Sequence, residues 1–167
     1  MMSALATCSA TAALVLTGAV SGVFFAFSVS VMRGLDAMDP GQAITAMQRI
    51  NQKILNPVFL TAFMGAPVAA AAAGALLLAL GRTSAALLLF LAAAIYVLGA
   101  FLPTAVVNVP MNEALDAVEP PSGREEAARV WSAYSARWTR WNTLRAGFSL
   151  LSLLQVGLAL LLWGGPT

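Results

Sequence analysis

Four long apolar runs without a charged side chain constrain this chain more than any other feature. They cover residues 3–31, 57–80, 83–107 and 146–163. The hydrocarbon core of a bilayer is about 30 Å thick, and a helix needs roughly 17 to 25 apolar residues to cross it. The sequence therefore predicts an all-α fold, in which a four-helix transmembrane bundle forms a single membrane domain over residues 1–167.

The apolar runs lack most ionisable side chains, and this limits the reactions and transport functions that the chain can have. Charged residues make up 10% of the chain, against about a quarter in a soluble domain, and Cys8 and Tyr96 are the only ionisable residues in the runs. Ion and proton pathways need charged or His side chains inside the membrane, which disfavours a pump. The chain has no His and a single Cys, which excludes imidazole ligation of a metal and a Cys pair. We therefore expect no metal site and no cofactor.

The basic residues are unevenly distributed over the connections. Eight of the nine Lys and Arg residues lie between runs one and two or between runs three and four, and Arg82 alone lies in the remaining connection. By the positive-inside rule, the two long connections are cytoplasmic and both termini lie outside, in the cell inner membrane. The basic residues do not cluster as nucleic-acid binding requires, so we expect the lipid bilayer, and no nucleic acid, as a partner.

Short helices are predicted beside the membrane in the long connections. Asp39 is placed to cap an amphipathic helix over about 40–55. Asn108 is placed to cap a second helix, over about 109–118, so that the third span ends before it. A further helix over about 124–145 leads into the last span.

One face of the helix that leads into the last span combines aromatic, amide and basic side chains. The residues recur at steps of three or four, which places them on one stripe. They are Trp131, Tyr134, Trp138, Trp141, Asn142 and Arg145. An aromatic belt at the membrane surface explains the Trp and Tyr residues. A binding pocket explains the Asn and Arg as well, since Trp rings stack on aromatic ligands and Arg and Asn donate to an oxyanion. Both interpretations stay open.

Amide side chains from the connections gather at the same membrane face in this topology. The segment NVPMNEAL places Asn108 and Asn112 four residues apart, after the third apolar run. Asn108 is either a simple helix cap or a site residue, whereas Asn112 needs a partner, because an amide removed from water must satisfy its donors and its acceptor. The polar residues expected at one opening are Arg33, Asn51, Asn56, Asn108, Asn112, Asn142 and Arg145.

Five segments, in their order and spacing, carry a resemblance to a known family. They are FFAFSVSVMRGL, MQRIN, NPVF, NVPMNEAL and WTRWNTLRA. Together they resemble the anthrone oxygenase family of small four-span integral membrane proteins, over about residues 14–163. Members named in polyketide pathways oxidise an anthrone to an anthraquinone with dioxygen. The resemblance implies a membrane oxygenase-like oxidoreductase that acts with dioxygen on a hydrophobic aromatic small molecule, an anthrone or a similar polycyclic phenol.

The resemblance also implies a set of site residues. An anthrone that loses a methylene proton becomes an electron-rich anion, which reacts with dioxygen without a metal. We expect Arg145 and Asn112 to stabilise the oxyanion and Glu113 to take the proton. Glu113 needs partial burial for that role, and the alternative is that it only favours a helix start. The residues expected to bind the substrate are Arg33, Asn51, Asn108, Trp138, Trp141 and Asn142.

Two interpretations without catalysis fit the same residues. A small membrane subunit would use the amides and the Trp stripe to bind a partner protein, and the Ala- and Gly-rich faces of the first two runs favour such a contact or a homo-oligomer. A quinone- or lipid-binding protein would hold an aromatic ligand tightly without turning it over.

Overall fold

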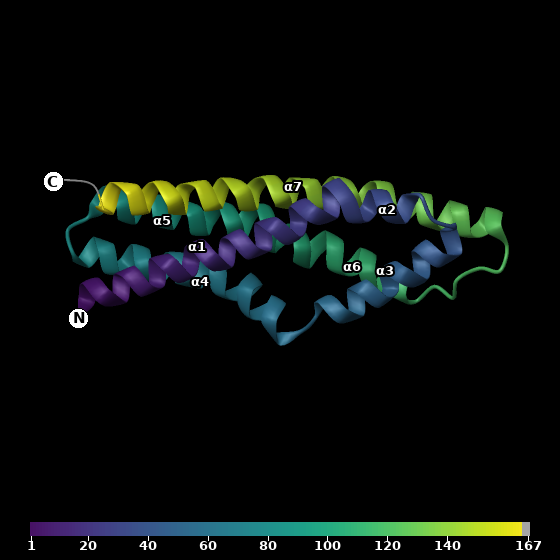
Figure 1. Ribbon diagram of the computed structural model, residues 1–167, viewed down its shortest axis with the longest axis horizontal. Coiled ribbons are helices and arrows are strands. Elements are labelled where there is room, and N and C mark those ends of the chain that lie inside the picture. The colour runs from purple at the N-terminus through teal and green to yellow at the C-terminus, as the bar shows by residue number, and fades with distance from the viewer. Residues whose placement is uncertain (165–167) are drawn as a thin grey trace.

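The four apolar runs form four long helices in the computed structural model, which describes residues 1–164. Each helix is long and apolar enough to cross a membrane, and their bounds are Met2–Asp36, Pro57–Ala79, Thr83–Asp116 and Arg124–Gly164. They alternate in direction, so that Met2 and Gly164 lie at one end of the molecule and the two long connections at the other (Figure 1). Residues 1–164 contain no strand. The predicted all-α fold is confirmed, and it fits a multi-pass membrane protein.

The long helices divide into shorter elements. The first consists of α1 (Met2–Ala26), the π-helical η1 (Phe27–Val31) and α2 (Met32–Asp36). Next come α3 (Pro40–Ile54) and α4 (Pro57–Ala79). The third long helix consists of α5 (Thr83–Tyr96), the π-helical η2 (Val97–Phe101) and η3 (Thr104–Asn108), and α6 (Val109–Asp116). The last is α7 (Arg124–Gly164).

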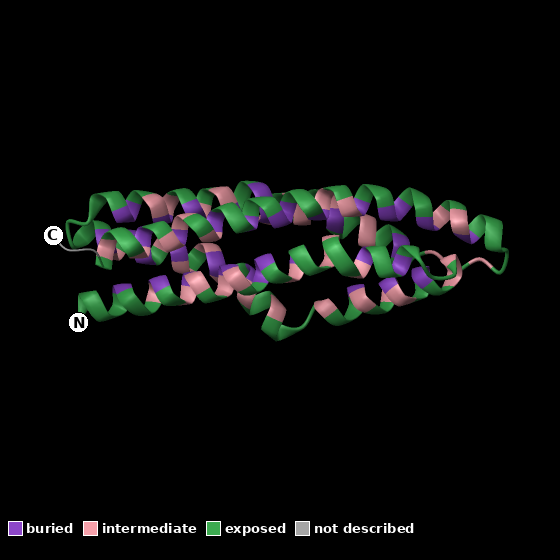
Figure 2. Ribbon diagram, turned by 45° about the horizontal axis from the view of Figure 1, so that its top comes forward, coloured by how far each residue is buried: buried purple, intermediate pink, exposed green. Residues whose placement is uncertain are grey.

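Small side chains fill the half of the molecule that contains the termini. Here α1 and α5 each contact α4 and α7, around a core in which most residues are Ala. Figure 2 shows the buried residues turned inward along each helix and the exposed ones outward, where many are Leu and Val. Because lipid tails are as apolar as these side chains, close packing between small residues is what holds helices together in a bilayer.

Larger side chains fill the other half, where α2, α3 and α6 pack against the first part of α7. The core there includes Met32, Ile44, Met47, Leu115 and Trp131. The 41 residues of α7 extend about 60 Å at 1.5 Å per residue, which is about twice the thickness of the hydrocarbon core. The apolar run of α7 covers only residues 146–163, so we expect this half of the molecule to project beyond the apolar layer of a bilayer.

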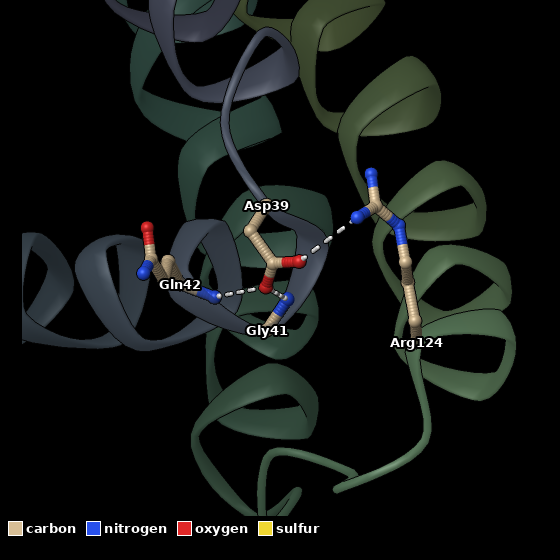
Figure 3. A network of polar contacts seen from close by, with 4 residues as sticks. All are labelled: Asp39, Gly41, Gln42 and Arg124. Carbon is tan, nitrogen blue, oxygen red and sulfur yellow. Dashed lines mark hydrogen bonds and ion pairs between the residues drawn. The ribbon is translucent and has the colours of Figure 1, made fainter.

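Capping residues begin α3 and α4. Asp39 Oδ1 accepts hydrogen bonds from the backbone N–H groups of Gly41 at 3.1 Å and Gln42 at 3.4 Å, which confirms the predicted cap. Its other oxygen lies 3.9 Å from Arg124 Nη1, so that the same carboxylate joins the starts of α3 and α7 (Figure 3). This pair is exposed and contributes only about 0–1 kcal/mol. Asn56 caps α4 in the same way.

The predicted helix cap at Asn108 is wrong. The chain continues from η3 into α6, and Asn108 has helical backbone angles (φ −72°, ψ −37°) and makes no side-chain capping hydrogen bond. Pro103 lies between η2 and η3, and Pro110 follows shortly after η3. A π-helical turn shifts the backbone hydrogen bonds by one residue, which lets a helix pass a proline without ending. The Asn108 side chain therefore serves no cap, and it is 1% exposed.

Candidate functional site

A small cavity lies where the two halves of the molecule meet. Its walls come from the ends of α1 and α3, the starts of α4 and α6, η1, η3 and the middle of α7, and its volume is about 80 Å³. The apolar lining residues are Val23, Phe24, Phe27, Ile50, Ile54, Leu55, Phe59, Val109 and Trp138. The polar lining residues are Asn51, Thr104, Asn108, Asn112, Asn142 and Arg145.

Among residues 1–164, Arg145 is the only charged residue in the cavity lining, and it is 4% exposed. Its Nη1 donates to Thr104 Oγ1 and its Nη2 to Asn142 Oδ1, each at 2.9 Å. Its guanidinium carbon lies 4.4 Å from the centre of the Phe24 ring and 5.5 Å from that of Trp138, within the range of cation–π attraction. Within residues 1–164 no carboxylate lies within salt-bridge distance of it. A buried cation without a counter-charge is a receptor for an anion.

Asn142 fixes Arg145 from the same face of α7. Its Nδ2 donates to the Phe24 carbonyl and to Ser28 Oγ, both at 2.7 Å, and its Oδ1 accepts from Arg145. The amide thus bridges the guanidinium to the point where α1 passes into the π-helical η1. We infer that Asn142 positions Arg145, since both hydrogens of its Nδ2 are already donated within the protein and its Oδ1 accepts from the guanidinium.

Asn112 is oriented by two aromatic donors of α7. Its Oδ1 accepts from Tyr134 Oη at 2.9 Å and from Trp138 Nε1 at 2.8 Å. Because both partners are donors, the oxygen of the Asn112 amide, and not its nitrogen, faces α7. Asn112 Nδ2 is left as a donor for whatever enters the cavity that Asn112 lines.

Several buried polar atoms around the cavity have no hydrogen-bond partner among the described residues. They are Asn51 Nδ2, Asn108 Nδ2, Asn108 Oδ1 and Arg145 Nε, and all three residues line the cavity. Leaving such a group unpaired costs about 1 to 3 kcal/mol. Three donors and one acceptor without partners, gathered at one small cavity, indicate a site built for a polar group that comes from outside the chain.

Aromatic rings form the other part of the site. The Trp138 ring lies 5.6 Å from Phe27 and 6.4 Å from Tyr134, measured between ring centres, and Trp131 continues the row at 5.8 Å from Tyr134. Trp131, Tyr134 and Trp138 are all buried. Such packing is more than an exposed aromatic belt provides, because rings held on both sides present a rigid wall to a flat ligand.

Six of the nine site residues predicted from the sequence line this cavity. They are Asn51, Asn108, Asn112, Trp138, Asn142 and Arg145. Arg33, Glu113 and Trp141 are not among its lining residues, and Arg33 and Glu113 are exposed. Trp141 lies instead with Arg137 and Arg140 along a separate hollow on the outside of α7. The burial that Glu113 would need as a base is therefore not met.

The sequence reasoning did not select Thr104 or Ser28. Thr104 Oγ1 accepts a hydrogen bond from Arg145 and donates one to the Ala100 carbonyl at 2.8 Å. Ser28 Oγ accepts a hydrogen bond from the Asn142 amide. Thr104 precedes Asn108 by four residues, so helical spacing would have placed both on one face. Ser28 carries no such signal, since it lies among apolar residues of the first run.

The acidic and sulfur side chains show no metal-binding cluster. Across residues 1–164, no group of three or more His, Cys, Asp or Glu side chains lies close enough together to hold a metal ion. The cavity instead combines one buried cation, amide donors and aromatic walls. This combination suits a flat molecule with a negatively charged oxygen at one edge.

One comparison with known proteins finds a match. The family model described as anthrone oxygenase matches residues 58–154, which is more than half of the chain and includes the cavity residues from Phe59 to Arg145. Searches of curated proteins and of solved structures find no match.

Proposed function

Because the chain belongs to the anthrone oxygenase family, we propose that it is a membrane oxidoreductase that converts an anthrone or a similar polycyclic phenol to a quinone with dioxygen. One observation carries this proposal: the buried guanidinium of Arg145 has no carboxylate partner among residues 1–164, and its Nε lacks a hydrogen-bond partner. A cation held in this way stabilises an anion more than a neutral molecule.

The reaction consumes one dioxygen for each anthrone. The methylene carbon loses a proton, and the resulting anion forms a bond to one oxygen atom of dioxygen. The peroxide that results takes up a proton at its outer oxygen. Loss of the second methylene proton then breaks the O–O bond, so that the carbon becomes a carbonyl and water leaves. The substrate supplies all the electrons, and the protein has only to favour and orient the anion.

The residues at the cavity divide between two tasks. Arg145 Nε and Asn112 Nδ2 donate to the oxyanion, while Asn51 and Asn108 bind neighbouring polar groups of the substrate. Trp138 contacts the edge of the ring system that enters the cavity. Asn142 and Thr104 keep the guanidinium in place through the hydrogen bonds that they accept from it. A single lost oxyanion donor typically lowers turnover about 10²- to 10³-fold.

The substrate enters this site as its anion. No carboxylate is among the residues that line the cavity within residues 1–164, and Glu113 is exposed. We therefore assign the first deprotonation to water at the membrane surface and the stabilisation of its product to Arg145. The proposed reaction needs no bound metal, which agrees with the absence of His from the chain.

Oxygen uptake by the purified protein tests the proposal. A simple anthrone is added in detergent, and oxygen consumption and anthraquinone formation are compared with the rate without protein at the same pH. We expect faster turnover with wild-type protein, an about 10²-fold or greater loss in Arg145→Met, and wild-type rates in Arg140→Met, which removes an exposed guanidinium from the same helix. A rate equal to the blank, together with tight binding of the anthraquinone, would instead identify a quinone-binding protein.

A further inference from the structure

The cavity changes character from its interior to its rim. The polar lining residues Asn51, Asn108, Asn142 and Arg145 are buried, at most 5% exposed. The polar lining residues Thr104 and Asn112 are half-buried, and the two lining residues among 1–164 that are exposed are aliphatic: Leu55 is 66% exposed and Val109 is 37% exposed. An opening onto water would be expected to present polar side chains, whereas an opening onto lipid presents apolar ones.

Exposed apolar side chains flank this rim on α4 and η3, and the exposed polar Asn56 lies in the corner between Leu55 and Val58. Val58, which follows the corner between α3 and α4, is 82% exposed, and Val106 on η3 is 60% exposed. The exposed Gln52 and Lys53 lie on the other side of the corner. Since α4 is one of the helices that is apolar enough to cross a membrane, its first residues lie where headgroups give way to acyl chains. Leu55 lies two residues before α4 and Val109 lines the same cavity, so we expect the rim to lie at that level.

The volume of the cavity limits how much of a ligand it holds. Pockets that enclose a drug-sized molecule measure about 300–1,000 Å³, and this cavity measures about 80 Å³. Only one edge of a flat polycyclic molecule fits inside. The rest of such a molecule extends past the rim, where an apolar surface and lipid are suitable surroundings for its rings.

We propose that the cavity opens sideways into the bilayer, through a portal between Leu55 at the α3–α4 corner and Val109 at the start of α6. The ligand is an amphiphile dissolved in the membrane, which inserts its anionic or hydroxyl-bearing edge toward Arg145 and leaves its apolar body at the portal. The identity of this ligand as a polycyclic phenol rests on the proposed function. The portal itself does not, because it follows from which lining residues are exposed.

A single-cysteine series tests where the portal opens. Cys8 is the only Cys in the chain, so Cys8→Ser gives a background without thiols. In this background Leu55→Cys and Val109→Cys each receive a bimane fluorophore, in vesicles of phosphatidylcholine and phosphatidylglycerol. We expect phospholipid that carries a doxyl group near the headgroup to quench most of the fluorescence at both positions. Aqueous iodide should quench both positions much less than it quenches Ser122→Cys, which lies in the exposed α6–α7 loop. Iodide quenching equal to that of Ser122→Cys at both positions would overturn the proposal.

Protection by a ligand tests whether the portal leads to the cavity. The ligand used is anthracene-9-carboxylate, a flat molecule of three rings with one anionic edge. At ten times its Kd it should slow the alkylation of Leu55→Cys about 10-fold. Val58→Cys is the matched control, since Val58 is exposed at the same corner and does not line the cavity. Equal slowing at both positions would overturn the proposal. Neither assay needs turnover, so a protein that fails to oxidise an anthrone and still shows protection refutes the proposed function alone.

Discussion

Arg145 and its neighbours show how single residues on one helix acquire different tasks. Five of the six residues of the α7 stripe are buried, as a 3.6-residue period predicts: Trp131, Tyr134, Trp138, Asn142 and Arg145. Trp141 lies about 60° around the helix from Trp138, at the edge of the stripe, and the structure turns it toward Arg137 and Arg140. Periodicity thus finds the centre of a buried stripe reliably, whereas packing against neighbouring helices decides its edges.

Asn108 offers a test that separates stability from function. Neither end of its buried amide has a hydrogen-bond partner in the part of the chain that the structure describes, so Asn108→Leu should raise the free energy of unfolding by about 1 to 3 kcal/mol while it slows anthrone oxidation. Asn142→Leu is the matched control, because that amide makes three hydrogen bonds, and its loss should destabilise the protein. Unfolding is followed by Trp fluorescence in mixed micelles, and turnover by oxygen uptake. Equal destabilisation by the two substitutions would show that Asn108 has a partner in the ligand-free protein.

Glu113 distinguishes two origins of the substrate anion. Its side chain is exposed and does not line the cavity, so Glu113→Gln should leave kcat/KM for an anthrone and its pH profile unchanged. The rate should rise with pH as the substrate ionises, in the variant as in the wild type. The measurement is kcat/KM across the pH range in which the anthrone titrates. A loss of activity in Glu113→Gln would restore the carboxylate as the base.

The elements that depend on local signals were predictable, and those that depend on a change of helix type were not. Asp39 caps α3 because its side chain reaches the next N–H groups along the chain, and the sequence shows that arrangement directly. The same reasoning failed at Asn108, because η2 and η3 carry the helix past Pro103. No residue pattern in the chain predicted the π-helical turns. Such turns are short and lie within an α-helix, so they leave the helical pattern of the sequence almost unchanged.

Gly99 tests the contact between η2 and α7. A Cβ added at Gly99 would overlap with Phe148 Cγ and Cβ, and no rotation of the Phe148 side chain moves its Cβ away. Gly99→Ala should therefore lower the free energy of unfolding by about 1 to 3 kcal/mol. Gly22→Ala in α1 is the control, since a Cβ there meets nothing within 4 Å, and it should be neutral or slightly stabilising. Mixed-micelle unfolding of both variants gives the comparison, and a Gly99→Ala protein as stable as Gly22→Ala would refute the close approach.

At the scale of the whole molecule, the site depends on how four helices converge. Phe24 comes from α1, Asn51 from α3, Asn108 and Asn112 from the third long helix, and Arg145 from α7. The alternating topology brings their polar segments to one end of the molecule, which the apolar runs were sufficient to predict. The rim was not predictable, because Leu55 and Val109 are ordinary aliphatic residues in a chain that is 60% hydrophobic. Only their exposure beside buried polar atoms distinguishes them.

The orientation in the membrane is a prediction for the whole chain that rests on charge alone. The end of the molecule that contains the long connections carries eight of the nine basic side chains, so it should face the cytoplasm. In the Cys8→Ser background, Ser122→Cys lies in the α6–α7 loop and Ser84→Cys at the start of α5, and both positions are exposed. A thiol reagent that does not cross membranes should label Ser84→Cys in intact cells and Ser122→Cys only after the cells are opened. The cavity lies toward the end with the long connections, so in this orientation its substrate would come from the cytoplasmic leaflet. The reverse labelling pattern would assign the outer leaflet as the source of substrate instead.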